Sequence, residues 1–169
     1  MTPVLRLYRR VDESLEPDLP PPPGQRLCRT AIAAALTVPS PRLANGDGVR
    51  IGLSLAFVGA AAMAELNGQF RQRPYPTNCL SFPTPSGAGP YRQDFLGDIV
   101  LAPAIVLREA VEQGKRPADH YRHLLIHSTL HLLGFDHEEA AEAAEMEALE
   151  THLLAQMGVA DPYQNPDHE

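Results

Sequence analysis

The sequence predicts an α+β fold, with a small mixed sheet of about four strands packed with about five helices. Three observations support this prediction. The length of 169 residues suits one domain, so we expect residues 1–169 to form a single unit. Hydrophobic residues make up 44% of the chain, which is enough to fill one core. Segments with the period of a strand interleave with segments of helical period, but without the regular order of a parallel βαβ sheet.

Each expected element follows from local signals. Residues 49–58 alternate apolar and polar side chains, which predicts a strand. Residues 17–24 form a proline-rich connection, which is stiff because proline fixes φ. Further strands are expected at 4–8, 79–82 and 97–102, and helices at 26–36, 60–70, 103–112, 117–133 and 138–156, with loops at 39–48 and 83–93 and a flexible tail at 158–169.

The run from His127 to His137 places three imidazoles at positions i, i+4 and i+10. Residues four apart on a helix lie one turn apart on the same face, so His127 and His131 can bind one ion. His137 would be out of reach if the helix continued through it. Gly134 removes this obstacle, because glycine readily adopts the left-handed conformation that lets a chain reverse after a helix. We therefore expect a metal site at the end of this helix, with three histidine ligands and an open position.

The other four histidines lack this arrangement. His123 lies eight residues before His131, about 12 Å along a helix axis, which is too far for one ion with zinc–nitrogen bonds of about 2.0–2.1 Å. We interpret His120 and His123 as ordinary surface or core residues. We expect one zinc ion per chain, although three histidines also suit nickel, cobalt or copper.

The net charge of −7 is unevenly distributed. Residues 136–169 contain ten of the 21 carboxylates and none of the 14 lysines and arginines, so residues 1–135 have a net charge of +3. Thirteen of the 14 basic residues are arginine, whose planar guanidinium suits phosphate. Overall acidity therefore does not exclude a locally basic phosphate site, although a solvated acidic helix beside an ordinary remainder explains the same pattern.

Composition also bears on location. No stretch approaches the roughly 18 consecutive apolar residues of a membrane span, so we expect no membrane association. The first ten residues lack the apolar core of a signal peptide. Cys28 and Cys79 do not form a disulfide framework. Together these features favour a cytoplasmic protein with reduced thiols.

One residue separates this run from a protease site. The spacing of the three histidines and Gly134 matches H-E-x-x-H-x-x-G-x-x-H of metzincin proteases, but Ser128 occupies the position of the glutamate. In those proteases the glutamate is the general base, and a serine cannot take up a proton in this way near neutral pH. The run therefore predicts a metal-dependent hydrolase other than a protease.

Three separated motifs resemble one family. The run HSTLHLLGFDH at 127–137 resembles H-G-x-L-H-L-x-G-[YF]-D-H, the signature of the YbeY family of bacterial rRNA-maturation endoribonucleases. Residues 66–83 resemble the family's L-N-x-x-[YF]-R…P-T-[ND]-V-L-S-F-P, and residues 96–99 resemble its L-G-D-I. The resemblance covers about residues 50–155. It departs at Ser128 and Cys79, where glycine and valine are usual, and does not extend to the first 45 residues.

The resemblance implies a single-strand-specific, zinc-dependent endoribonuclease that acts in 16S rRNA 3′-end maturation and ribosome quality control. Its partners would be single-stranded rRNA and the small ribosomal subunit or its proteins. The implied zinc ligands are His127, His131 and His137, with His127 also counted as catalytic. A functional arginine is implied at Arg71, which suits the negative charge that phosphodiester cleavage builds on non-bridging oxygens.

Four further residues are candidates for a supporting role. Asn67 and Ser81 either orient loops near the site or have ordinary capping roles. Asp136 either accepts a hydrogen bond from a ligand histidine or caps the following helix. Ser128 adjoins the first ligand in the chain. We interpret Arg73 as solvated.

Two alternative functions remain at this point. The chain could work mainly as a ribosome-assembly binding factor with a structural metal, although an open coordination position argues against this. A metalloprotease-like hydrolase is the minor alternative. The sequence assigns no general base, cleavage site or oligomeric state.

Overall fold

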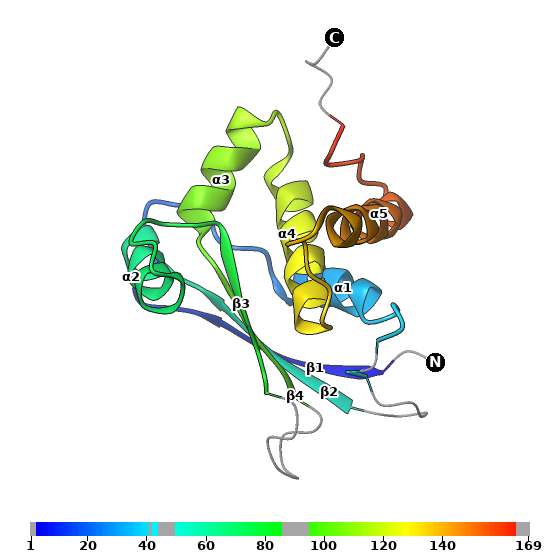
Figure 1. The fold of residues 1–169 in the computed structure, drawn as a ribbon. Helices are drawn as coiled ribbons and strands as arrows, with labels where there is room; N and C mark the ends of the chain where they lie inside the picture. Colours follow the sequence, from blue (N-terminus) through cyan, green and yellow to red (C-terminus); the bar gives the residue numbers. More distant parts are fainter. Residues whose placement is uncertain (1–2, 41, 44–49, 86–94, 165–169) are drawn as a thin grey trace.

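The computed structural model describes residues 3–40, 42–43, 50–85 and 95–164. It confirms an α+β fold with a mixed sheet (Figure 1). In chain order the elements are β1 (Val4–Val11), α1 (Gln25–Ala35), β2 (Arg50–Phe57), α2 (Ala60–Arg71), β3 (Cys79–Pro83), β4 (Phe95–Leu101), α3 (Pro103–Glu112), α4 (Pro117–Leu132) and α5 (Ala140–Gln156).

The four strands have the order β1-β2-β4-β3. β1, β2 and β4 are parallel, and β3 pairs antiparallel with β4 at one edge. β1 continues to Val11, three residues beyond the expected strand, because its last residues stay in register with β2 as far as Val11 opposite Phe57. The mixed arrangement places β3 beside the helix that carries the histidines.

The sheet buries both of its faces over part of its length. On β2, Leu53, Leu55 and Phe57 point into the main core, which α1, α4 and α5 cover. Ala56 points to the opposite face, where a smaller cluster forms against Met63 of α2. This alternation is the two-residue period of a strand. The helices α1, α4 and α5 lie together on one side of the sheet, and α2 lies near its far end (Figure 1).

The central helix of this layer is α4. It contacts α1, α3, α5 and the strands β3 and β4, so apolar side chains surround most of it. Leu125, Ile126, Leu130 and Leu132 are completely buried. Helix α4 therefore presents its histidines from a rigid core element.

Glycine ends three of the helices, α3, α4 and α5. Gly114, Gly134 and Gly158 follow α3, α4 and α5 with φ of +65°, +100° and +75°. In each case the next residue donates its backbone N–H to a carbonyl five residues earlier, as Phe135 does to Leu130 at 3.0 Å. This is the Schellman arrangement, and it turns the chain sharply after each helix.

The first part of the tail expected at 158–169 is among the described residues. Residues 161–164 turn back onto α5, where the backbone N–H of Tyr163 donates to Asp161 Oδ1 at 2.8 Å. Asp161 Oδ1 also accepts from Thr151 Oγ of α5 at 3.3 Å. Side-chain hydrogen bonds thus hold a segment whose composition resembles a tail. Residues 165–169 and most of the loop expected at 83–93 lie outside the described residues.

No helix within the described ranges is both long and apolar enough to cross a membrane.

Candidate metal centre and active-site cleft

The structure brings the three histidines of the run together. Candidate ligand nitrogens of His127, His131 and His137 all lie within 4.8 Å of one another. Four bonds of about 2.0–2.1 Å around a tetrahedral zinc ion place ligand atoms about 3.4 Å apart, so small ring rotations would close this set. Across the described ranges, no other cluster of histidine, cysteine or acidic residues meets the same geometry.

The return of His137 depends on the end of α4. The backbone N–H of Gly134 donates to the His131 carbonyl at 3.0 Å. Ser40 Oγ donates to the Leu133 carbonyl at 2.7 Å. This hydrogen bond satisfies one of the carbonyls that have no partner within the helix at its C-terminal end. The ring of His137 then lies 4.9 Å from that of His131 and 5.7 Å from that of His127, measured between centroids.

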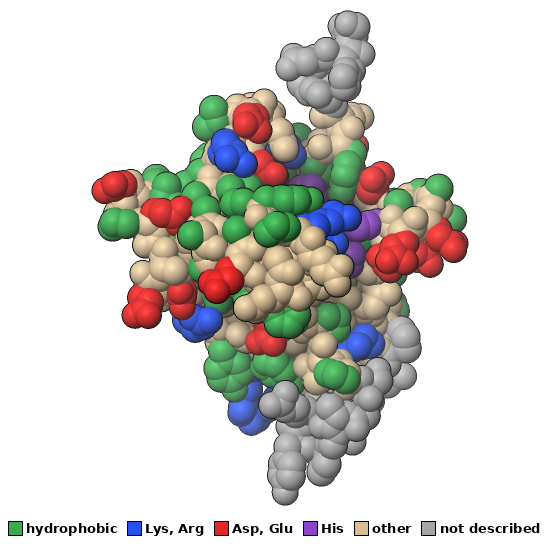
Figure 2. Space-filling model, turned by 60° about the vertical axis from the view of Figure 1, so that its left-hand side comes forward, with side chains coloured by type: hydrophobic (Ala, Val, Ile, Leu, Met, Phe, Trp, Pro, Cys, Tyr) green, Lys and Arg blue, Asp and Glu red, His purple; other side chains and the backbone are tan. Residues whose placement is uncertain are grey.

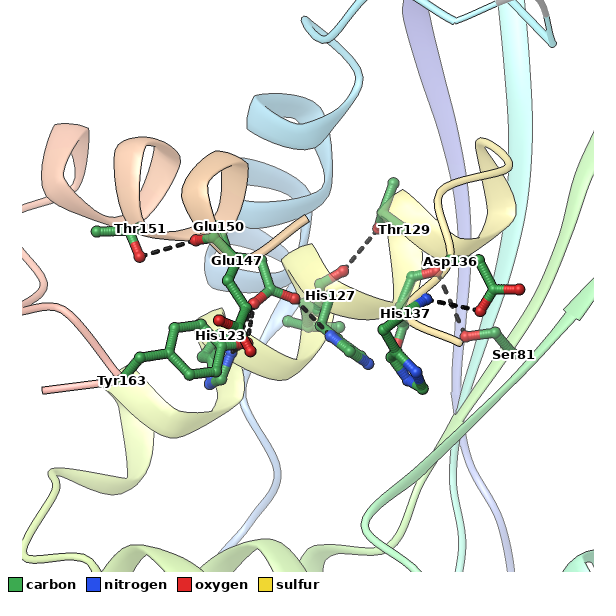
Figure 3. Close-up of polar contacts among 12 residues, drawn as sticks. Ser81, His123, His127, Thr129, Asp136, His137, Glu147, Glu150, Thr151 and Tyr163 are labelled. Atoms are coloured by element: carbon green, nitrogen blue, oxygen red, sulfur yellow. Dashed lines mark hydrogen bonds and ion pairs between the residues drawn. The ribbon is translucent and has the colours of Figure 1, made fainter. Parts of the chain in front are cut away.

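A buried carboxylate lies behind the first histidine. Glu150 of α5 is 0% exposed, and its Oε1 accepts a hydrogen bond from His127 Nδ1 at 2.5 Å (Figure 3). Because a carboxylate only accepts, the proton of His127 is on Nδ1, and Nε2 is left to bind a metal. Burial acts to raise the pKa of Glu150, but hydrogen bonds from His123, His127 and Tyr163 lower it to about 2.

His131 has the chemistry of a ligand. Burial, together with the positive charges that His127 and His137 can carry, lowers the pKa of His131 to about 4. The imidazole is therefore neutral near pH 7, as a metal ligand must be. Three imidazoles, one with a carboxylate partner and all facing an open cleft, fit a zinc ion with a free coordination position.

The centre lies in a cleft of about 850 Å³. Its walls come from the end of α2, from residues 77–83 and from the segment 134–138, and Phe70 and Arg71 line it from α2. Arg71 therefore shares one cavity with the three histidines. Figure 2 shows histidine side chains in a hollow beside lysine or arginine side chains, with a group of acidic side chains close by.

Ser128 does not lie in the cleft. It is 0% exposed, and its Oγ has no hydrogen-bond partner within the described part of the chain. Its carbonyl accepts from Ser81 Oγ at 3.4 Å, which joins α4 to β3.

The other supporting candidates have local roles. Asn67 Nδ2 donates to the Tyr75 carbonyl at 2.9 Å, which connects α2 to the chain before β3. Asp136 Oδ1 accepts from the backbone N–H of His137 at 2.7 Å. The residue that caps α5 is Glu139, which makes no side-chain cap hydrogen bond. Arg73 is exposed, as interpreted from the sequence.

Sequence reasoning missed Glu150 and Tyr163. A signal for Glu150 was present, because it lies four residues after Met146 and three before Leu153, on the apolar face of α5. A carboxylate in such a position is rarely unpaired. Tyr163 gave no signal, since it follows the last helix in a polar segment.

The fold and the site define a class of protein, in which a small α+β domain carries an open three-histidine centre in a cleft with an arginine. Comparison with known proteins shows the family. Residues 27–158 match the family described as Endoribonuclease YbeY. This chain belongs to the YbeY endoribonuclease family.

Comparison with individual relatives supports this family assignment. The endoribonuclease YbeY of Alkalilimnicola ehrlichii is 45% identical over 143 residues, which cover 83% of this chain and 82% of the relative. That of Halorhodospira halophila is 48% identical over 114 residues, covering 66% and 74%. A solution structure of a Thermotoga maritima protein superposes with a TM-score of 0.52 at 18% identity, covering 97% of this chain and 99% of that one, and supports the fold alone.

Proposed function

We propose that this protein is a zinc-dependent, single-strand-specific endoribonuclease that acts in 16S rRNA 3′-end maturation and ribosome quality control. The observation that carries the proposal is that the three histidines and Arg71 line one cleft. Membership of the YbeY family supports RNA as the substrate. The site of action would be the cytoplasm, with the small ribosomal subunit or its proteins as partners.

His127, His131 and His137 would hold one zinc ion. When bound, zinc supplies a Lewis acid that activates water and polarises a phosphate oxygen. Glu150 keeps the proton of His127 on Nδ1, so the ring is oriented with Nε2 toward the ion. Asp136 is held against the backbone of His137 and adds a negative charge beside the three imidazoles.

Arg71 would bind the scissile phosphate. It is the last residue of α2, and it is followed by Gln72 in the left-handed conformation with φ of 57°. A guanidinium can donate two parallel hydrogen bonds to non-bridging oxygens, and this stabilises the charge that develops as the phosphodiester is cleaved.

Phe70 supports an unpaired RNA substrate. Its ring is 62% exposed although it lines the cleft, and an edge-on contact with Phe82, 4.9 Å between centroids, holds it in place. An exposed, braced aromatic ring is a platform on which an unstacked base can lie. Paired bases are already stacked and have no free face to offer.

The test is cleavage of a synthetic RNA with the sequence of a small-subunit rRNA 3′ end, single-stranded or annealed to its complement. We expect zinc-loaded wild type to cut the single strand, and chelator to stop the reaction. Arg71→Ala should lower kcat by roughly 10²- to 10³-fold, as removal of one transition-state donor does elsewhere. Arg73→Ala is the matched control, since Arg73 is exposed and is not among the residues lining the cleft.

Two results would contradict the proposal. Equal cleavage with and without chelator would show that the metal is not needed for the reaction. Equal rates for Arg71→Ala and wild type would remove Arg71 from the chemistry. Rescue of a deletion strain by a folded His131→Ala variant would instead favour the assembly-factor alternative.

A further inference from the structure

A network of hydrogen bonds connects the end of the described chain to the metal centre. Glu150 uses both carboxylate oxygens (Figure 3). Oε1 accepts from His127 Nδ1 at 2.5 Å, while Oε2 accepts from the Tyr163 hydroxyl and lies 3.3 Å from His123 Nε2. The carboxylate is fully buried between α4 and the residues that follow α5.

The contacts of Glu150 Oε2 affect the hydrogen bond that Oε1 accepts from His127. One hydrogen bond from His127 leaves the carboxylate free to rotate about its own side chain, and the imidazole would follow this rotation. Partners on Oε2 fix the plane of the carboxylate and, through it, the direction in which His127 Nε2 points. Such partners behind a metal ligand commonly change metal affinity by about 10- to 100-fold.

Tyr163 is itself held in place. Gly158 ends α5 with φ of +75°, and Val159 N donates to the Leu154 carbonyl at 2.9 Å, so the chain reverses. Asp161 Oδ1 then accepts from Tyr163 N at 2.8 Å and from Thr151 Oγ at 3.3 Å.

The tyrosine therefore returns to the same helical turn that carries Glu150, which immediately precedes Thr151 in the chain. Its ring meets that of His123 edge-on, 5.5 Å between centroids. Tyr163 remains 44% exposed, so it covers the buried carboxylate from the solvent side.

We propose that Tyr163 is a positioning residue of the metal centre, which acts through Glu150 to hold His127 in the orientation that binds metal. This inference rests on the proposed function, since it concerns the same three-histidine centre. It adds that the segment after α5, beyond the residues that match the family, is part of the machinery that binds metal. The role needs the hydroxyl of Tyr163 and not only its ring.

The experiment measures the zinc dissociation constant of metal-stripped, full-length protein by competition with a chromophoric chelator. Tyr163→Phe removes the hydroxyl and keeps the ring, and we expect zinc binding to weaken by roughly tenfold. Glu150→Gln should weaken it at least as much. Tyr8→Phe is the matched control, because Tyr8 is an exposed tyrosine on β1 outside the cleft, and it should bind zinc like wild type.

A double variant tests whether Tyr163 acts through Glu150. If Tyr163 acts through Glu150, adding Tyr163→Phe to Glu150→Gln should weaken zinc binding little further. Asp161→Ala removes the acceptor that anchors Tyr163 without touching Glu150, and it should weaken zinc binding in the same direction. This variant keeps the inference testable if Tyr163→Phe does not fold.

The outcomes separate the two proposals. Wild type that binds no zinc would overturn both. Wild type that binds zinc, with Tyr163→Phe and Asp161→Ala indistinguishable from Tyr8→Phe, would overturn the role of Tyr163 and leave the metal centre intact. Fully additive losses in the double variant would show that Tyr163 does not act through Glu150.

Discussion

Gly134 shows how one residue completes the metal centre. Its φ of +100° is a conformation that residues with a Cβ rarely adopt, and the turn it makes brings His137 back beside His127 and His131. A Cβ added at this position would meet no atom closer than Arg42 Cδ at 3.9 Å. The requirement for glycine therefore comes from the backbone and not from crowding.

Gly134→Ala should lower the free energy of unfolding by about 1–2 kcal/mol, the cost of a left-handed conformation for a residue with a Cβ. It should also weaken zinc binding, because relief of this strain moves His137. Urea unfolding of the metal-free protein and zinc competition measure the two effects. Gly114→Ala is the control, since Gly114 also has positive φ in open space but lies after α3. A Gly134→Ala variant with unchanged zinc affinity would contradict this account.

At the scale of secondary-structure elements, the carboxylate of Glu109 connects α3, the start of β3 and α4. Glu109 Oε1 of α3 accepts from Asn78 Nδ2 at 2.9 Å, just before β3, and lies 3.0 Å from His120 Nε2 of α4. Burial opposes the ionisation of Glu109, but these hydrogen bonds outweigh it and lower its pKa. The contact holds the start of β3, which lines the cleft, against the helix that carries the histidines.

This lowered pKa gives a pH-dependent prediction. A carboxylate whose pKa is lower in the folded state stabilises the protein above its ordinary pKa of 4.5, and the contribution is lost as the pH falls through the folded value. Glu109→Gln should therefore lower the free energy of unfolding by on the order of 1 kcal/mol at neutral pH, with a smaller difference in more acidic solution.

Urea titrations of wild type and variant at several pH values would measure this difference. Glu112→Gln is the control, since the only ion-pair partner of the exposed Glu112 among the described residues is Arg108, at 4.0 Å. A constant difference between Glu109→Gln and wild type down to about pH 3 would show that ionisation of Glu109 is not its source.

At the scale of the whole molecule, metal binding by the three histidines would be linked to stability. The three ligands come from α4 and the segment after it, and Glu150 connects them to α5, so the centre forms only when these elements are assembled. A ligand that binds only the folded state stabilises it, by about 2.7 kcal/mol when its free concentration is 100 times its dissociation constant.

Zinc should therefore raise the Tm of metal-stripped protein by several degrees, and chelator should reverse the change. Thermal unfolding followed by circular dichroism measures the shift. His131→Ala should abolish it, whereas His152→Ala, at an exposed position on α5, should leave it unchanged. A full zinc shift in His131→Ala would mean that the ion binds elsewhere.

The distribution of charged residues is also a property of the whole molecule. Four of the ten acidic residues from 136 onward belong to α5, and three of these four, Glu142, Glu145 and Glu147, are exposed. Arg71 lines the cleft from α2, which precedes the three histidines in the sequence. Asp136 and Glu138 also line the cleft, so its described walls combine acidic groups with Arg71 and the three histidines.

The sequence by itself determined the elements, to within a few residues, and the three-histidine set. Both follow from local rules, because the spacing of His127 and His131 is one helical turn and Gly134 makes the turn that returns His137. The importance of Arg71 came only from resemblance, since no local rule predicts that the end of α2 faces the end of α4.

Only the tertiary structure decided what surrounds the metal ligands. His127 and Glu150 are 23 residues apart, and His123 and Tyr163 are 40 apart, so their contacts depend on how α5 and the chain after it pack against α4. It also showed that Ser128 is fully buried beside β3 while its neighbour His127 lines the cleft. Periodicity predicts which face of a helix is apolar, but the partner of a polar group on that face is set by the assembly of distant elements.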